Sequence, residues 1–274
     1  MIHSKNYPLL FFPEIAGKTR QWYCGDSKEY YDKHNKPKWK YYNTEDKLFY
    51  KFNKLGYRTT ELDALPEKFV LVFGCSYTEG VGMFEETLWC NILAEKYNFN
   101  VINLAKAGTG PDIINFNTQL WVKNNFIKPQ AVIVQWPQAT RKSFSYIKRN
   151  GLFGTTHLQL EDRNVMIDDQ LYNPDDSYQS KDTEWYFKRW ISEEGQLHYE
   201  NLLHINSVTN VWKSLGVPIL NWTWQGDFEL KYDKDMLHMV KTTGGSRARD
   251  GDHDGEEIHQ QVVQQIEDKV KCMI

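Results

Sequence analysis

Four short, uninterrupted apolar runs constrain this chain more than any other feature of its sequence. The runs are FVLVFG (69–74), FNVINL (99–104), AVIVQW (131–136) and VPILNW (217–222). Runs without polar alternation are typical of strands buried on both faces of a parallel sheet. Between and after them, apolar residues recur at helical spacing over 86–97, from Pro111 onward, over 199–215 and over 255–270. The alternation predicts an α/β domain with three layers and a mostly parallel sheet.

Two segments depart from this pattern. Residues 1–66 hold 14 of the chain's aromatic residues and carry more Lys and Arg than Asp and Glu. Since burial of one large ring stabilises by about 1.5–3 kcal/mol, we expect this N-terminal extension to pack on the main domain, residues 67–274. Within that domain, residues 142–198 are polar and rich in Asp and Tyr. They are interpreted as an insertion that can cap the site.

Charge and hydropathy exclude several classes of protein. The net charge is −3, so no global field attracts nucleic acid or anionic lipid. No run of about 18 apolar residues exists, and the first residues lack a signal-peptide pattern. The four cysteines are widely spaced and match no disulfide framework or zinc site. We therefore expect a cytoplasmic protein with reduced thiols and no nucleic-acid or membrane partner, its oligomeric state open.

The residues that follow the first two predicted strands suggest acyl chemistry. Ligands of open α/β sheets collect beyond the carboxyl ends of the strands. Ser76 lies there in a turn, Gly74–Gly80, and is a candidate nucleophile if a base reaches it. Gly108 precedes the predicted helix at Pro111, so its backbone N–H is a candidate donor to an oxyanion. Each feature taken alone is also typical of an ordinary structural turn.

A histidine with an aspartate three residues upstream precedes the last predicted helix. Asp254, with Glu257 three residues on, predicts a helix N-cap that would hold His253 in a defined turn. Asp250 can then reach His253 Nδ1 and leave Nε2 to take a proton from a serine. The pattern Asp250-x-Asp252-x-Asp254 also opens a calcium-binding loop, but the twelfth position of such a loop is occupied here by Gln261 instead of glutamate.

In this order along the chain, these elements resemble the SGNH (GDSL-type) hydrolase family. The resemblance covers residues 68–137 and 205–266, through the strings VLVFGCSYTEGVG, VINLAKAGTG and RDGDHDGEEIHQQVV. Upstream, the stretch Asn53–Arg58 looks like an N-x-x-G-[FY]-R element found in some members. The resemblance implies a flavodoxin-like three-layer α/β/α sandwich.

It also implies a role for each candidate residue. Ser76 would be the nucleophile, His253 the base and Asp250 its orienting partner. The oxyanion hole would use the N–H groups of Ser76 and Gly108 and an asparagine side chain from the segment after the third strand. That segment, Gln135–Gln138, has no asparagine, so either Gln138 supplies the amide donor, one methylene further out, or the donor is missing. A second departure is Cys75, where the family has aspartate.

The favoured function is a serine esterase that works through an acyl-enzyme on O-acyl groups, such as O-acetyl, of a carbohydrate-like or small ester. It needs no cofactor and no metal. Trp136, at a strand end on the same edge, is the candidate substrate-binding ring, and Trp185, Tyr186 and Trp190 of the insertion could cap that edge. Two alternatives remain: an O-acyltransferase with the same site, and a non-catalytic glycan-binding or structural module.

Overall fold

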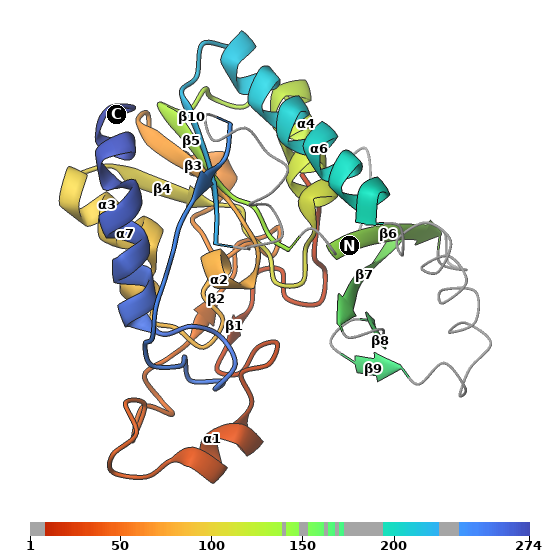
Figure 1. Cartoon of the computed structure of the whole chain (residues 1–274). Coiled ribbons are helices and arrows are strands. Elements are labelled where there is room, and N and C mark those ends of the chain that lie inside the picture. The colour runs from red at the N-terminus through yellow and green to blue at the C-terminus, as the bar shows by residue number, and fades with distance from the viewer. Residues whose placement is uncertain are drawn as a thin grey trace.

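The computed structural model describes residues 9–138, 141–147, 153–161, 164–167, 170–172, 194–224 and 236–274 (Figure 1). Its centre is a parallel five-stranded sheet with the strand order β11-β10-β5-β3-β4. The strands are β3 (Phe69–Phe73), β4 (Asn100–Asn103), β5 (Ala131–Gln135), β10 (Ile219–Thr223) and β11 (His238–Met239). Numbered along the chain within this sheet, the order is 2-1-3-4-5, which is that of flavodoxin-like folds. The predicted α/β class is confirmed, and β11 is a strand that the apolar runs did not reveal.

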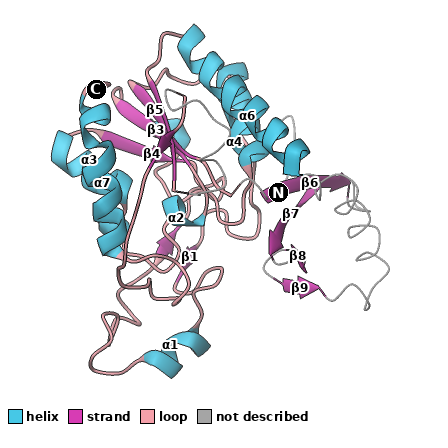
Figure 2. Ribbon diagram, in the orientation of Figure 1, coloured by secondary structure: helices cyan, strands magenta, loops and turns pink. Residues whose placement is uncertain are grey.

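Helices cover both faces of the sheet (Figure 2). One layer is α4 (Pro111–Lys123) with α6 (Glu194–Ser214), and the other is α3 (Trp89–Tyr97) with α7 (Glu256–Lys271). Strand β3 shows why its sequence is apolar throughout. Leu71 packs in the same cluster as Trp121 of α4, whereas Val72 packs in the opposite cluster with Trp89 of α3. Both faces of the strand are buried, so neither tolerates polar residues.

Three predicted helix starts are wrong. The helix expected over 199–215 begins five residues earlier, at Glu194. The helix expected at residue 86 begins at Trp89, after the 3₁₀ turn η2 (Glu85–Thr87). Asp254 does not cap α7, because the N-cap residue is Gly255. The Asp254 carboxylate instead accepts a hydrogen bond from Arg247 Nη1 at 3.1 Å, and residues 247 and 254 form a β-bridge.

The N-terminal residues form short elements around two apolar groups. The elements are β1 (Thr19–Arg20), α1 (Lys28–His34), β2 (Tyr50–Lys51) and the 3₁₀ turn η1 (Leu62–Ala64). Leu9, Phe12 and Tyr57 join the core on the α4–α6 side of the sheet. Tyr41, Leu48, Tyr50 and Phe52 form a separate buried cluster.

From Arg141 to Tyr172, the described residues of this region form an antiparallel sheet. Its strands, in the order β6-β7-β8-β9, are β6 (Arg141–Ile147), β7 (Phe153–Glu161), β8 (Asn164–Ile167) and β9 (Gln170–Tyr172). Strand β6 adjoins α4. Trp185, Tyr186 and Trp190, named above as possible capping rings, lie outside the described residues. No helix in the described part of the chain has the length and apolar character needed to cross a membrane.

Candidate active site

Ser76 lies directly beyond the carboxyl end of the central strand β3. It is the first residue of the single-turn helix α2 (Ser76–Glu79), and Cys75 before it is extended. The carbonyl of Cys75 accepts hydrogen bonds from Thr78 N at 3.0 Å and Glu79 N at 2.9 Å, which closes the turn. Ser76 is 4% exposed, and within the described residues its side chain makes no hydrogen bond. Its hydroxyl is therefore available for chemistry.

The side chain of Gln135, the last residue of β5, stabilises the Ser76 turn through hydrogen bonds. Its Oε1 accepts hydrogen bonds from Cys75 N at 3.1 Å and from Thr78 Oγ1 at 3.2 Å, and the side chain is fully buried. A Cβ on Gly74 would lie 2.5 Å from Thr78 Oγ1 and 2.9 Å from Gln135 Oε1, so only glycine fits there. The sequence reasoning missed Gln135, because a glutamine that ends an apolar run gives no signal of its partner.

Gly108 lies beyond the end of the neighbouring strand β4, in a left-handed conformation with φ +74°. The N–H groups around it are occupied: Lys106 N donates to Gly74 O, Ala107 N to Glu79 Oε2 and Thr109 N to Lys106 O. The N–H groups of Gly108 and Ser76 donate to no group in the part of the chain that the structure describes. Both N–H groups are therefore available to hold a developing negative charge.

Gln138, the expected third donor, follows β5 by three residues and is half-buried. Its Oε1 accepts a hydrogen bond from Arg141 Nε at 3.3 Å, so Nε2 is the end that can donate to a ligand. Its role in an oxyanion hole stays a prediction.

Asp250 and His253 form a closed turn immediately before α7. Asp250 Oδ2 contacts His253 Nδ1 at 2.5 Å, and Oδ1 accepts hydrogen bonds from the backbone N–H groups of His253 and Asp252 at 3.1 and 3.2 Å. The Asp250 side chain is fully buried, whereas that of His253 is 13% exposed. Nδ1 faces an acceptor-only carboxylate, so it carries the proton and Nε2 is left as the base. These contacts also contradict a calcium loop, because both Asp250 oxygens are occupied and Asp254 pairs with Arg247.

Tyr77 brings the two halves of the site together. Its ring meets the His253 ring edge to face, with centroids 4.9 Å apart, and meets the Trp224 ring at 4.5 Å. Since Tyr77 follows Ser76 directly, the serine and the histidine lie on segments in contact. No hydrogen bond joins Ser76 to His253 among the described residues. Burial raises the pKa of Tyr77, so its phenol stays neutral.

The expected substrate-binding role of Trp136 is contradicted. Trp136 is 0% exposed, belongs to the core on the α4–α6 side and donates its Nε1–H to Asn221 Oδ1 at 3.0 Å. Its ring has no free face for a substrate. Trp222 is equally buried, and Trp224 is the half-buried tryptophan of this edge. Position at a strand end placed these rings near the site, but the side to which each ring points is decided by packing.

A buried ion pair, absent from the sequence reasoning, connects the serine turn to the Gly108 loop. Lys106 Nζ lies 2.5 Å from Glu79 Oε1, and both side chains are almost fully buried. Tyr23 OH contacts both groups, and the rings of Phe12, Tyr23 and Phe52 surround the ammonium at 4.6–5.1 Å. Burial lowers the pKa of Lys106, an effect that Glu79 opposes. No local pattern marks Glu79 and Lys106 as partners 27 residues apart.

No group of three or more His, Cys, Asp and Glu side chains in the described part of the chain is arranged to hold a metal ion. The candidate site described above comprises a serine, an aspartate–histidine pair and the backbone donors of Ser76 and Gly108.

Comparison with known proteins yields likeness in structure alone. No protein-family profile matches the chain, and no curated protein matches its sequence. The chain is similar to the crystal structure of TesA, at 12% identity and TM-score 0.43, over 75% of this chain and 99% of that one. It is similar to a carbohydrate esterase described as having divergent catalytic and non-catalytic binding functions, at 11% identity and TM-score 0.44, over 76% and 67% of the two chains. An acetyl xylan esterase from the rumen bacterium Butyrivibrio proteoclasticus matches at 12% identity and TM-score 0.41, over 76% and 66%. At these identities the likeness is one of fold. The chemistry of the site rests on its own contacts.

Proposed function

We propose that this protein is a serine esterase that cleaves O-acyl groups, such as O-acetyl, from a carbohydrate-like or small alcohol through an acyl-enzyme. The observation that carries the proposal is the Asp250–His253 turn, whose histidine contacts the residue after a serine with a free hydroxyl. The unpaired N–H groups of Ser76 and Gly108 support it, because acyl transfer needs donors for the carbonyl oxygen.

The reaction has two halves, acylation of Ser76 and hydrolysis of the acyl-enzyme, and the same groups act in both. Ser76 Oγ attacks the acyl carbon while His253 Nε2 takes the hydroxyl proton. Asp250 stabilises the imidazolium and keeps Nδ1 protonated. The carbonyl oxygen becomes an oxyanion facing the two backbone donors, and the C–O bond to the alcohol breaks as His253 returns the proton to the leaving oxygen. Water then attacks the acyl-enzyme by the same route, releasing the carboxylic acid and Ser76.

The rings beside His253 support a flat or apolar substrate face. Tyr77 and Trp224 are half-buried and in mutual contact, so each keeps part of its surface free at the edge where the site lies. Aromatic rings of this kind pack against apolar groups and the C–H faces of sugars.

The test is hydrolysis of an activated acetate ester by the wild type, Ser76→Ala and the control Ser207→Ala, whose serine lies on α6 and bonds Asn115. Ser76→Ala should lower kcat roughly 10³-fold or more, and Ser207→Ala should leave it unchanged. A fluorophosphonate probe should label Ser76, and the labelled peptide identifies the site. Wild-type activity in Ser76→Ala, or a label on another residue, contradicts the mechanism.

A further inference from the structure

A tight turn of the N-terminal extension, Tyr23–Asp26, contacts both halves of the candidate active site. We call it the 23–26 turn. Two backbone hydrogen bonds close it, from Tyr23 N to Asp26 O and from Asp26 N to Tyr23 O, both at 3.1 Å. Its first and last residues carry buried polar groups that point into different parts of the main domain.

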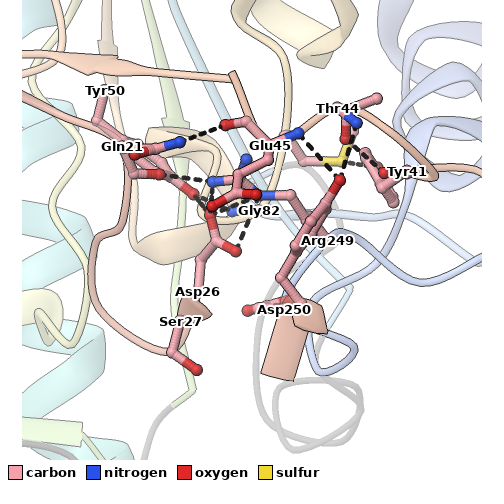
Figure 3. Close-up of polar contacts among 12 residues, drawn as sticks. Gln21, Asp26, Ser27, Tyr41, Thr44, Glu45, Tyr50, Gly82, Arg249 and Asp250 are labelled. Atoms are coloured by element: carbon pink, nitrogen blue, oxygen red, sulfur yellow. Dashed lines mark hydrogen bonds and ion pairs between the residues drawn. The ribbon is translucent and has the colours of Figure 1, made fainter. Parts of the chain in front are cut away.

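At one end, Asp26 pairs with Arg249, the residue before Asp250 (Figure 3). Arg249 Nη2 lies 2.6 Å from Asp26 Oδ2, and Nε lies 3.0 and 3.1 Å from the two carboxylate oxygens. Both side chains are 0% exposed, and the guanidinium lies over the Trp22 ring at 4.3 Å. The partners are 223 residues apart along the chain, so only the fold brings them together.

Tyr50 extends this contact to the segment that follows Ser76. Its hydroxyl donates to Asp26 Oδ2 at 2.5 Å and accepts from Gly82 N at 2.8 Å. Gly82 O in turn accepts from Arg249 N at 2.9 Å. The four residues form a closed ring of hydrogen bonds around the start of the Asp250–His253 turn, drawn in Figure 3.

The extension also covers the catalytic carboxylate itself. A Cβ added to Gly25 would lie 3.6 Å from Asp250 Oδ2, the oxygen that contacts His253. Tyr30 of α1 lies so close to Gly251 that a Cβ there would overlap its hydroxyl. The Asp250 side chain is fully buried as a result, and a dry carboxylate interacts more strongly with an imidazolium than a hydrated one.

At the other end of the turn, Tyr23 reaches the oxyanion side. Its hydroxyl lies 3.2 Å from Glu79 Oε2, the oxygen to which Ala107 N donates at 2.6 Å, and 2.5 Å from Lys106 Nζ. Ala107 precedes Gly108, so Tyr23 and Glu79 hold the loop that presents the candidate oxyanion donor.

From these contacts we infer that the 23–26 turn is a positioning element of the active site. Asp26 acts through Arg249 on the Asp250–His253 turn, and Tyr23 acts through Glu79 on the Gly108 loop. Neither residue belongs to the Ser76, Asp250 and His253 set itself. The inference rests on the proposed function for its kinetic consequence, but the positions of the contacts are independent of it.

A buried ion pair is a poor source of stability, because its desolvation costs about as much as its attraction returns. The contribution of Asp26 is to orient Arg249. The bidentate hydrogen bonds restrict the position of the Arg249 side chain, and Asp250 is the next residue in the chain, so its position is restricted too. Loss of that orientation should lower turnover more than substrate binding, since a displacement of about 1 Å at a reacting group costs roughly 10²-fold.

The experiment compares Asp26→Asn with Tyr57→Phe. Tyr57 also lies in the extension and makes a buried hydrogen bond, from Asn117 Nδ2 at 2.9 Å, but in the core on the α4–α6 side. Asp26→Asn should lower kcat roughly 10- to 100-fold with KM within about 2-fold, whereas Tyr57→Phe leaves kcat unchanged. In proton NMR, the far-downfield resonance of His253 Nδ1–H, identified by its loss in His253→Gln, should weaken or shift in Asp26→Asn alone.

An Asp26→Asn protein that is folded and keeps both the wild-type kcat and the wild-type resonance overturns the inference. If Asp26→Asn does not fold, Tyr50→Phe replaces it: the ion pair is retained, and the same fall in kcat and the same change in the resonance are expected. An esterase assay that Ser76→Ala leaves unchanged removes the proposed function instead. In that case the His253 Nδ1–H resonance is the only test of the positioning role. An unchanged resonance in folded Asp26→Asn then overturns the inference.

Discussion

Substitution of Gly82 by alanine tests how closely this glycine packs against the segment that carries Asp250. The comparison with a second glycine of similar φ separates the cost of the backbone conformation from the cost of the close contacts. Gly82 has a left-handed conformation with φ +72°, and a Cβ there would lie 2.9 Å from Ala248 Cβ, 3.0 Å from Arg249 N and 3.1 Å from Asp250 N. Two of these three neighbours are backbone atoms, which cannot rotate away. Gly17 has nearly the same φ, +66°, with no heavy atom within 4 Å of its hypothetical Cβ.

Gly82→Ala and Gly17→Ala therefore share the free-energy cost of the left-handed backbone but differ in the cost of close contacts. Each variant places an L-residue in the left-handed region, at about 1–2 kcal/mol, and each gains equally from the less flexible unfolded chain. Only Gly82→Ala adds overpacking against Ala248–Asp250, at about 1–3 kcal/mol. We expect Gly82→Ala to lower the free energy of unfolding by about 1–3 kcal/mol more than Gly17→Ala does.

Urea unfolding of both variants measures this difference, and ester hydrolysis measures its effect on the site. Since the methyl group pushes on the N–H of Asp250, kcat of Gly82→Ala should fall by up to roughly 10²-fold, whereas Gly17→Ala keeps the wild-type kcat. Equal losses of stability in the two variants, or full activity in Gly82→Ala, would refute the close packing of the Ser76 and Asp250 segments.

Two further predictions concern buried polar groups. Burial and nearby His253 lower the pKa of His259 to about 4, and its Nδ1 accepts a hydrogen bond from Trp89 N at 3.0 Å. The unfolded chain binds this proton near pH 6.5, so the free energy of unfolding should fall by up to about 3 kcal/mol as pH drops from 6.5 to 4. His259→Asn should reduce that slope in urea unfolding at several pH values, and an unchanged slope would contradict the assignment. Gln135→Leu removes the acceptor for Cys75 N and should cost about 1–3 kcal/mol, whereas exposed Gln119→Leu should change stability by less than about 0.5 kcal/mol. Similar values for the two leucine variants would show that the Ser76 turn does not depend on Gln135.

The elements of the sheet were predictable because burial on both faces leaves a local trace. Strands β3, β5 and β10 appear as apolar runs, and Pro111 marks the start of α4. The Asp250–His253 contact was predictable for a different reason: it joins residues three apart and depends on a single turn. The wrong N-cap at Asp254 shows the limit of local rules, because the distinction between Asp254 and Gly255 depends on the bridge to Arg247.

By itself, the sequence determined the α/β class, four of the five strands of the central sheet and the candidates Ser76, Gly108, Asp250 and His253. Only the tertiary structure decided that Trp136 is buried in the core, and that Asp26 and Tyr23 of the extension reach Arg249 and Glu79. The physical reason is the distance along the chain. Periodicity and turn chemistry act over a few residues and are written in neighbouring letters, whereas a buried ion pair between residues 26 and 249 has no local period and exists only after the sheet has brought its ends together.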